Sequence, residues 1–226
     1  MANTQEHTVK AFDQDIGQLR GLISQMGGLA EQAIQQAITA LQRGDHELAG
    51  KVREADRRID AIEADVERTA VRIIALRAPM ANDLREVVAA LKIASVTERI
   101  GDYAKNIAKR VPMIESEQRI DPLSTLPAMA RMAAEMVRDA LDAFAARDSD
   151  AALEICRRDE ALDDFYDSIF RVLVTYMVEN PKTISQCAHL LFVAKNLERI
   201  GDHATNIAEM VYFAATGTQM TDRKEA

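Results

Sequence analysis

The placement of five prolines constrains the fold of this 226-residue chain more than any other feature. They stand at positions 79, 112, 122, 127 and 181. Because proline removes a backbone donor and clashes with the preceding turn, helices end near it. Between the prolines, apolar residues recur at intervals of three and four, as from Val52 to Ile73 and from Ile93 to Ile107. This period is typical of amphipathic helices, and the sequence therefore predicts an all-α protein.

Polar turns at 44–45 and 148–150 bring the predicted number of long helices to six. Their predicted ranges are 8–43, 46–77, 82–111, 124–147, 150–179 and 182–215. The first range contains four glycines, at 17, 21, 27 and 28. Each costs about 1 kcal/mol relative to alanine, so a bend or a late start is expected there. Asn82 and Thr183 follow prolines closely and are the predicted N-caps of the third and sixth helices.

One segment of eleven residues occurs twice, one hundred positions apart. Residues 98–108 read ERIGDYAKNIA and residues 198–208 read ERIGDHATNIA, so nine of eleven positions are identical. The order long helix, tight turn, long helix, proline break, long helix also occurs twice. The repeat therefore predicts two tandem, pseudo-symmetric three-helix bundles, residues 1–115 and residues 116–226.

Each copy of the repeat carries acidic side chains on one face of its helix. Glu98 and Asp102 are four residues apart, as are Glu198 and Asp202, and residues at this spacing share a face. Two such acids repel each other, and the glycine between them weakens the helix further. A partner that compensates this repulsion is therefore expected. The neighbouring row of residues on the same helix consists mostly of small side chains, which would let another helix approach closely.

The second helix of each half supplies a candidate for that partner in a further acid pair. Because the chain returns antiparallel after the proline break, each pair is expected to lie opposite the acids of the following helix. Clustered carboxylates suit a hard cation, and an all-oxygen set favours Mg, Mn or ferric iron over zinc. The predicted metal ligands are Asp56, Asp60, Glu98, Asp102, Asp159, Asp163, Glu198 and Asp202.

An alternative interpretation of these acids stays open, because acids at this spacing beside many arginines also form solvated, ion-paired helix faces. His203 replaces Tyr103 in the second copy and is interpreted as a core or rim residue rather than a ligand. Cys156 and Cys187 have no metal-type spacing and are interpreted as core residues in a reducing compartment.

Composition and missing motifs exclude several functions. The net charge of −8 and the lack of a basic stripe argue against nucleic-acid binding. The apolar runs fall far short of the ~18 residues of a membrane span, so no membrane insertion is expected. The N-terminus lacks a secretory signal, and a soluble, cytoplasmic protein is expected. No nucleophile elbow or phosphate loop occurs, so no enzymatic activity is expected.

The segment RAPMANDLR at residues 77–85, followed by the two copies of Glu-Arg-Ile-Gly-Asp, resembles the PhoU family of phosphate-uptake regulators. The resemblance covers essentially the whole chain. It implies a regulator that couples a phosphate ABC transporter, through its ATPase subunit, to a sensor histidine kinase and acts negatively when phosphate is plentiful. It also implies a homodimer and metal clusters on the eight acids named above. The second half departs from the first, since no Asp-Leu-Arg follows Pro181.

A second function class stays open beside this one. The same acids would serve a metal-binding or metal-storing helical bundle without a signalling role. The number of ions bound per chain discriminates between the two, because storage requires many ions and an adaptor needs few.

Overall fold

The computed structural model describes residues 2–114 and 124–220, and within them it contains six long helices and no strand. The helices are α1 (Ala2–Arg43), α2 (His46–Arg77), α3 (Asn82–Ala108), α4 (Leu126–Ala146), α5 (Ser149–Glu179) and α6 (Ile184–Thr216). Two 3-10 turns, η1 (Val111–Met113) and η3 (Pro181–Thr183), accompany them. The predicted all-α class is confirmed.

Most helix ends lie within three residues of their predicted positions, and α1 is the exception. It begins at Ala2 and runs without interruption through all four glycines. The expectation of a late start was therefore wrong. Helix α1 packs against α2, α3 and α4, and tertiary packing of an amphipathic face contributes more to helix stability than intrinsic propensity does.

The two predicted N-caps do not act as caps. The capping position of α3 is Ala81, with φ of 48°, and Asn82 is already helical. Thr183 occupies the capping position of α6, but its hydroxyl donates to the carbonyl oxygen of Asn180 at 2.7 Å. Pro79 lies just before the turn that leads into α3, and Pro181 is the first residue of the 3-10 turn η3 that leads into α6.

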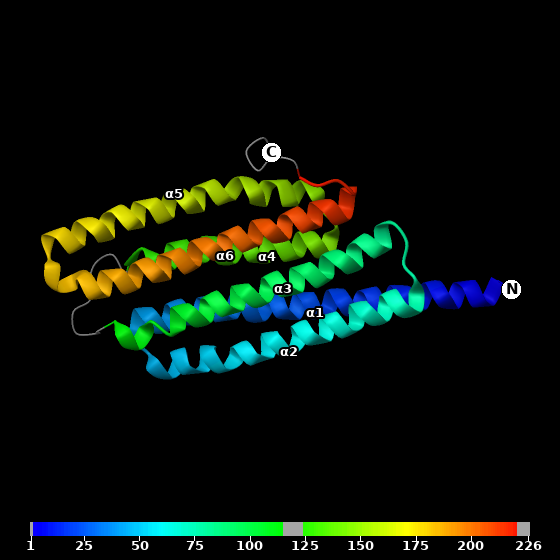
Figure 1. Cartoon of the computed structure of the whole chain (residues 1–226), viewed down its shortest axis with the longest axis horizontal. Helices are drawn as coiled ribbons and strands as arrows, with labels where there is room; N and C mark the ends of the chain where they lie inside the picture. Colours follow the sequence, from blue (N-terminus) through cyan, green and yellow to red (C-terminus); the bar gives the residue numbers. More distant parts are fainter. Residues whose placement is uncertain (1, 115–123, 221–226) are drawn as a thin grey trace.

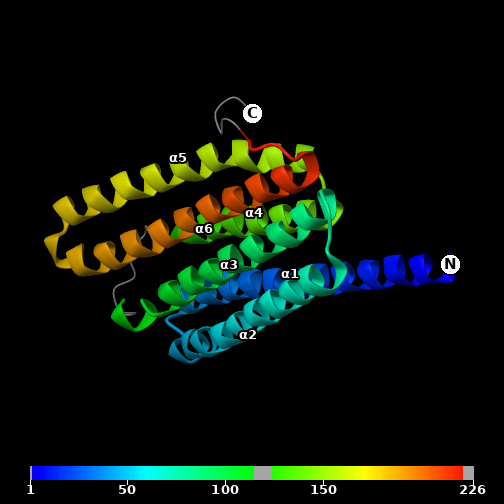
Figure 2. The same ribbon diagram turned by 45° about the vertical axis from the view of Figure 1, so that its right-hand side comes forward.

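The six helices form two three-helix bundles, as predicted. Helices α1, α2 and α3 pack together, and α4, α5 and α6 repeat the arrangement. The bundles meet through α3 against α6 and α1 against α4, which leaves α2 and α5 at the two outer edges (Figures 1 and 2). The predicted division between residues 115 and 116 lies outside the described residues.

Equivalent residues of the repeat meet where α3 crosses α6. The rings of Tyr103 and His203 stack with centroids 5.3 Å apart, and His203 Nε2 lies 3.3 Å from the Tyr103 hydroxyl. Burial and the nearby Arg99 guanidinium lower the pKa of His203. His203 is thus a packing residue of this seam, which agrees with its interpretation as a core or rim residue.

The interior is built largely from alanine and aliphatic side chains, and small residues let helices approach closely. A Cβ added at Gly27 of α1 would lie only 2.3 Å from Leu141 Cδ1 of α4. Cys156 and Cys187 are buried, which confirms their interpretation as core residues.

A buried carboxylate, which sequence reasoning missed, ties the two bundles together. Glu86 of α3 is 5% exposed and lies 2.6 Å from the guanidinium of Arg20 in α1. It also forms an ion pair with Arg147, which follows α4. Arg147 has φ of 56°, and its counterpart in the first half is Gly44, with φ of 64°. An arginine in this left-handed conformation carries a strain that glycine lacks, and the ion pair offsets it.

Candidate functional site

Both predicted acid rows lie where an outer helix packs against the repeat segment. A Cβ added at Gly101 would lie 3.3 Å from Asp56 Oδ1, and one added at Gly201 would lie 3.3 Å from Asp159 Oδ1. The predicted close approach of the second helix of each half is therefore confirmed, with α2 over α3 and α5 over α6. We call the α2–α3 acids Asp56, Asp60, Glu63, Glu98 and Asp102 the first acidic cluster. The second acidic cluster comprises Asp159, Asp163, Glu198 and Asp202 of α5 and α6.

The carboxylates of the first acidic cluster disfavour one another's charge. Burial, followed by repulsion from Asp102 and Glu63, raises the pKa of Glu98. Burial and the neighbouring Asp56 raise the pKa of Asp60 in the same way. Asp56 and Asp60 lie on α2, and Glu98 and Asp102 lie on α3. Since acids of the two helices repel one another, the structure brings the four predicted residues of this half together.

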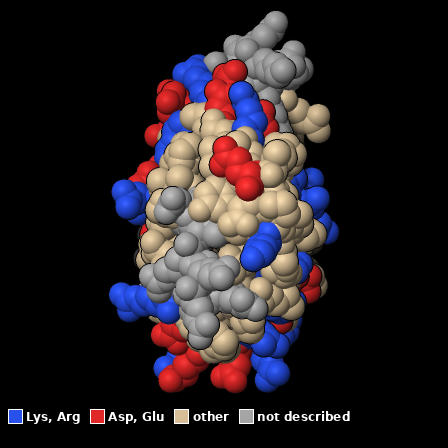
Figure 3. Space-filling model, turned by 90° about the vertical axis from the view of Figure 1, so that its left-hand side faces the viewer, with Lys and Arg blue, Asp and Glu red and all other residues tan. Residues whose placement is uncertain are grey.

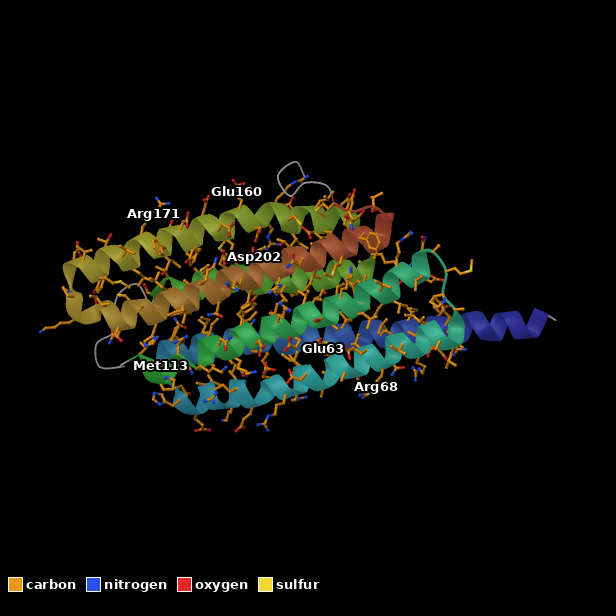
Figure 4. All side chains as sticks on the ribbon, viewed as in Figure 1. Glu63, Arg68, Met113, Glu160, Arg171 and Asp202 are labelled. Carbon is orange, nitrogen blue, oxygen red and sulfur yellow. The ribbon has the colours of Figure 1, made fainter. Side chains whose placement is uncertain are left out.

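Glu63 belongs to the first acidic cluster although it was not predicted. It lies seven residues after Asp56 on the same helix, a spacing that returns to the same face and that identifies it in retrospect. Burial and Glu67 raise its pKa, while a hydrogen bond with Ser95 of α3 lowers it. Figure 4 shows Glu63 between α2 and α3, whereas Arg68 lies on the outer side of α2.

A lysine stands among the acids of the first cluster. Lys105 Nζ lies 2.8 Å from Asp102 Oδ1 of its own helix and forms a second ion pair with Asp56 of α2. Hydrogen bonds to Asp102 and Asp56 raise the pKa of Lys105, so it is an ammonium ion at neutral pH. For Asp56 and Asp102, the ion-paired alternative therefore describes the structure.

The second acidic cluster has its lysine at another position. Lys195 Nζ lies 2.5 Å from Glu198 Oε1 and 5.2 Å from the centre of the Tyr166 ring. Glu198 Oε2 is buried and has no hydrogen-bond partner. Burial, followed by repulsion from Asp202 of α6, raises the pKa of Asp163 of α5, and the nearby Lys195 lowers it. Acids of α5 and α6 therefore lie close enough to interact. Asp202 lies on α6 in the same central region of the molecule (Figure 4).

The carboxylates are gathered in these clusters but do not converge on a point. Within residues 2–114 and 124–220, no three His, Cys, Asp or Glu side chains lie close enough together to hold a metal ion as they stand. Metal binding by the eight predicted residues stays a prediction. Burial and repulsion between neighbouring acids raise the pKa of Asp60, Glu63 and Glu98 in the first cluster and of Asp163 in the second.

Removing one charge from the first acidic cluster is expected to stabilise the metal-free protein. The folded state raises the pKa of Glu98 above that of the unfolded chain, so ionised Glu98 opposes folding at pH 7 and this penalty fades as the pH falls. We expect Glu98→Gln to unfold at a higher temperature than wild type at pH 7 in chelator, and the difference to shrink towards pH 4.

Glu160→Gln is the matched control for this change. Glu160 is exposed on the outer side of α5, away from the other helices (Figure 4). Its removal should leave the melting temperature and its pH dependence nearly unchanged. A lower melting temperature for Glu98→Gln at pH 7 would contradict the assigned repulsion.

Exposed apolar side chains gather at the turns that lead into α3 and α6, at opposite ends of the molecule (Figure 1). Leu76 and Met80 are 69% and 79% exposed beside the first turn, and Val178 is 77% exposed beside the second. Ile184, Phe192 and Met113 add to the second end, where Figure 3 shows a broad, mostly uncharged area. Exposed apolar areas of this kind are typical of protein-binding surfaces.

No helix among the described residues has the length and apolar character needed to cross a membrane.

Comparisons with known proteins agree on one family. The PhoU domain matches residues 23–111 and 126–211, once in each half of the chain. A phosphate-specific transport system accessory protein PhoU homolog from Zymomonas mobilis is 57% identical over 217 residues, 96% of this chain and 92% of the relative. The Caulobacter vibrioides homolog is 46% identical over 223 residues, 97% of this chain and 96% of the relative.

Solved structures give the same result. The crystal structure of PhoU from Pseudomonas aeruginosa matches with a TM-score of 0.87 and 38% identity, over 92% of this chain and 100% of that one. The phosphate transport system regulatory protein PhoU from Streptococcus pneumoniae matches with a TM-score of 0.87 and 27% identity, over 93% of this chain and 100% of that one.

Proposed function

This chain belongs to the PhoU family, and from that premise we propose that it is a cytoplasmic regulator of phosphate uptake and of phosphate-starvation signalling. In this proposal it acts as an adaptor between the ATPase subunit of a phosphate ABC transporter and a sensor histidine kinase, and it restrains the response when phosphate is plentiful. The observation that carries the proposal is the match of the PhoU domain to both halves, together with relatives named as transport accessory proteins.

The surface supports binding to other proteins rather than catalysis. The apolar side chains at the two ends, Leu76 and Met80 at one and Val178 at the other, are available for contact. We propose that these ends meet the transporter and the kinase, that the chain works as a homodimer, and that no chemical turnover is involved. The net charge of −8 gives no support to a nucleic-acid partner.

We also propose that the acidic clusters bind a hard cation such as Mg, Mn or ferric iron. The proposed ligands are Asp56, Asp60, Glu98, Asp102, Asp159, Asp163, Glu198 and Asp202. Their donor atoms are all carboxylate oxygens, which suit these ions better than zinc. The buried, unpartnered Glu198 Oε2 supports cation binding in the second half. A bound ion would offset the repulsion among the acids and draw each outer helix towards its neighbour.

Deleting the gene tests the regulatory role directly. In phosphate-rich medium, we expect a reporter of a phosphate-scavenging gene to be strongly switched on in the deletion strain and silent in the parent. The wild-type gene supplied in trans should silence it again. An unchanged reporter in the deletion strain would contradict the adaptor role.

Two variants, supplied in trans in the deletion strain, test whether the exposed apolar ends are needed for this role. Met80→Asp and Val178→Asp place a charge on the exposed apolar ends without touching the core, and each should fold normally by circular dichroism while failing to silence the reporter. Glu160→Gln, on the outer side of α5, should complement fully. Full complementation by both aspartate variants would show that partners bind elsewhere.

A further inference from the structure

Two of the residues that are identical in both copies of the repeat belong neither to the core nor to the acidic clusters. Nine positions of the eleven-residue segment are identical. Five of them are buried in both copies, and in the first copy these are Ile100, Gly101, Ala104, Ile107 and Ala108. The glutamate and the aspartate belong to the acidic clusters. An arginine (Arg99 and Arg199) and an asparagine (Asn106 and Asn206) remain to be explained.

The two arginines flank the stacked rings of Tyr103 and His203 at the seam where α3 crosses α6. Each one precedes a ring of the stack by four residues, so it lies one helical turn away on the same face. Asn206 Nδ2 lies 3.3 Å from His203 Nδ1. Helices α3 and α6 run in opposite directions past the stack (Figure 1). Arg99 therefore lies on the Asn206 side of the stack, and Arg199 lies on the opposite side.

Both guanidinium groups act on a ring of the other half. A hydrogen bond with the Tyr103 hydroxyl of α3 raises the pKa of Arg199 of α6. After burial, the charge of Arg99 of α3 contributes most to lowering the pKa of His203 of α6; Arg199 adds to this effect and Asp202 opposes it. Two positive charges therefore lie beside one pair of rings, where they repel each other.

An ion pair neutralises neither arginine. Both side chains are exposed, and among the described residues no ion pair joins either guanidinium group to a carboxylate. Glu198 and Asp202 attract Arg199 only at longer range. The chain has 36 acidic residues and 28 lysines and arginines, so acids that could pair with exposed arginines are in excess. That this matched pair has none leaves a positive site on the seam.

We propose that the seam between α3 and α6 binds one anion that carries a phosphate group, and that Arg99 and Arg199 hold it. A guanidinium group donates paired hydrogen bonds to phosphate oxygens, and such charge-assisted bonds are roughly twice as strong as neutral ones. Asn106 adds a donor, because its Oδ1 already accepts from Lys109 Nζ at 3.0 Å and its amide nitrogen is left to donate. The anion offsets the repulsion between the two arginines and joins the two bundles at their seam.

This inference goes beyond the proposed adaptor role, to which it adds a direct contact with phosphate. The phosphate group belongs either to the inorganic ion or to a phosphorylated small molecule, and the seam recognises the part that both share.

Isothermal titration calorimetry on the full chain tests the proposal. Inorganic phosphate, pyrophosphate and ATP are titrated separately in the presence of chelator, which removes any metal ion that would carry phosphate to the acidic clusters. We expect at least one of the three to bind saturably, at one site per chain, and more weakly as salt is added. Binding of inorganic phosphate identifies the free ion as the ligand, whereas binding of pyrophosphate or ATP alone identifies a phosphorylated molecule.

Substitutions at the two arginines locate the site. Arg99→Gln and Arg199→Gln should each weaken binding at least about tenfold, because each removes one charged hydrogen-bonding group, and together they should abolish it. The double lysine variant keeps both charges but loses the paired donors, so its affinity should lie between those of wild type and the double glutamine variant. Arg171→Gln is the matched control. Arg171 is exposed on the outer side of α5 (Figure 4), and its loss should leave binding unchanged.

Three results would overturn the inference. The first is that wild type binds none of the three anions, and the second is that the double glutamine variant, folded by circular dichroism, binds as tightly as wild type. The third is that Arg171→Gln weakens binding as much as Arg99→Gln, which would mean that the anion responds to the overall charge of the chain. Each would leave the adaptor role standing, because the deletion strain tests that role separately.

Discussion

Gly201→Val is expected to lower the free energy of unfolding by about 3 kcal/mol, near the upper end of what overpacking a core costs. A Cβ at this position would lie 2.2 Å from Leu162 Cδ2 and 3.3 Å from Asp159 Oδ1, so α5 has to move away from α6. Leu162 is fully buried and has little room to turn aside. Urea unfolding monitored by circular dichroism measures the change.

Gly28→Val provides the control, because Gly28 is also a mid-helix glycine but nothing lies within 4 Å of its added Cβ. Its stability should stay within about 0.5 kcal/mol of wild type, the range of ordinary surface substitutions. Equal losses in the two variants would show that valine is disfavoured in these helices for reasons other than close packing. In the Gly201 variant, the displaced α5 should also weaken any cation binding by the second acidic cluster.

Glu86→Gln is expected to lower the free energy of unfolding by about 2–3 kcal/mol. Breaking a buried ion pair commonly costs about 3–5 kcal/mol, and the expected loss is smaller here because the guanidinium groups of Arg20 and Arg147 reach water. The glutamine is nearly isosteric, so the change removes charge and leaves packing in place. Thermal and urea unfolding at pH 7 measure the effect.

Arg147→Gly separates the contribution of the Arg147–Glu86 ion pair from the backbone strain at Arg147. The variant loses one ion pair but also relieves the positive φ of Arg147, which glycine adopts without strain. It should therefore cost less stability than Glu86→Gln. A larger loss for Arg147→Gly would mean that the arginine contributes mainly through packing against the first bundle, which holds Glu86.

The fold was predictable because its signals are local. Proline positions and the three-four apolar period act within one helix, and the duplicated segment identified the two halves without any knowledge of their contacts. The late start predicted for α1 was wrong because the cost of its four glycines in helix propensity is offset by the packing of α1 against α2, α3 and α4. The caps at Asn82 and Thr183 failed for a related reason, since the turns after Pro79 and Pro181 depend on backbone angles, such as the positive φ of Ala81, that no propensity scale encodes.

The acid rows were predictable and their counter-charges were not. Spacing along a helix placed Glu98 with Asp102 on one face, and the antiparallel return brought Asp56 beside them. The pairing of Lys105 with Asp56 joins residues 49 apart and depends on the depth to which α2 settles over Gly101. Glu86 and Arg147 are 61 residues apart and meet only because the two bundles dock. Sequence spacing holds no information about such contacts.

The stacking of Tyr103 on His203 has a consequence for the origin of the molecule. When equivalent residues face each other across an approximate twofold axis, the same surface is used by both sides, which is the defining property of the interface in a symmetric dimer. The chain therefore has the architecture of two identical subunits joined into one polypeptide. In a true dimer every substitution appears on both sides at once. Once the subunits are fused, a tyrosine and a histidine can share the axis, and one half can acquire a lysine that the other lacks.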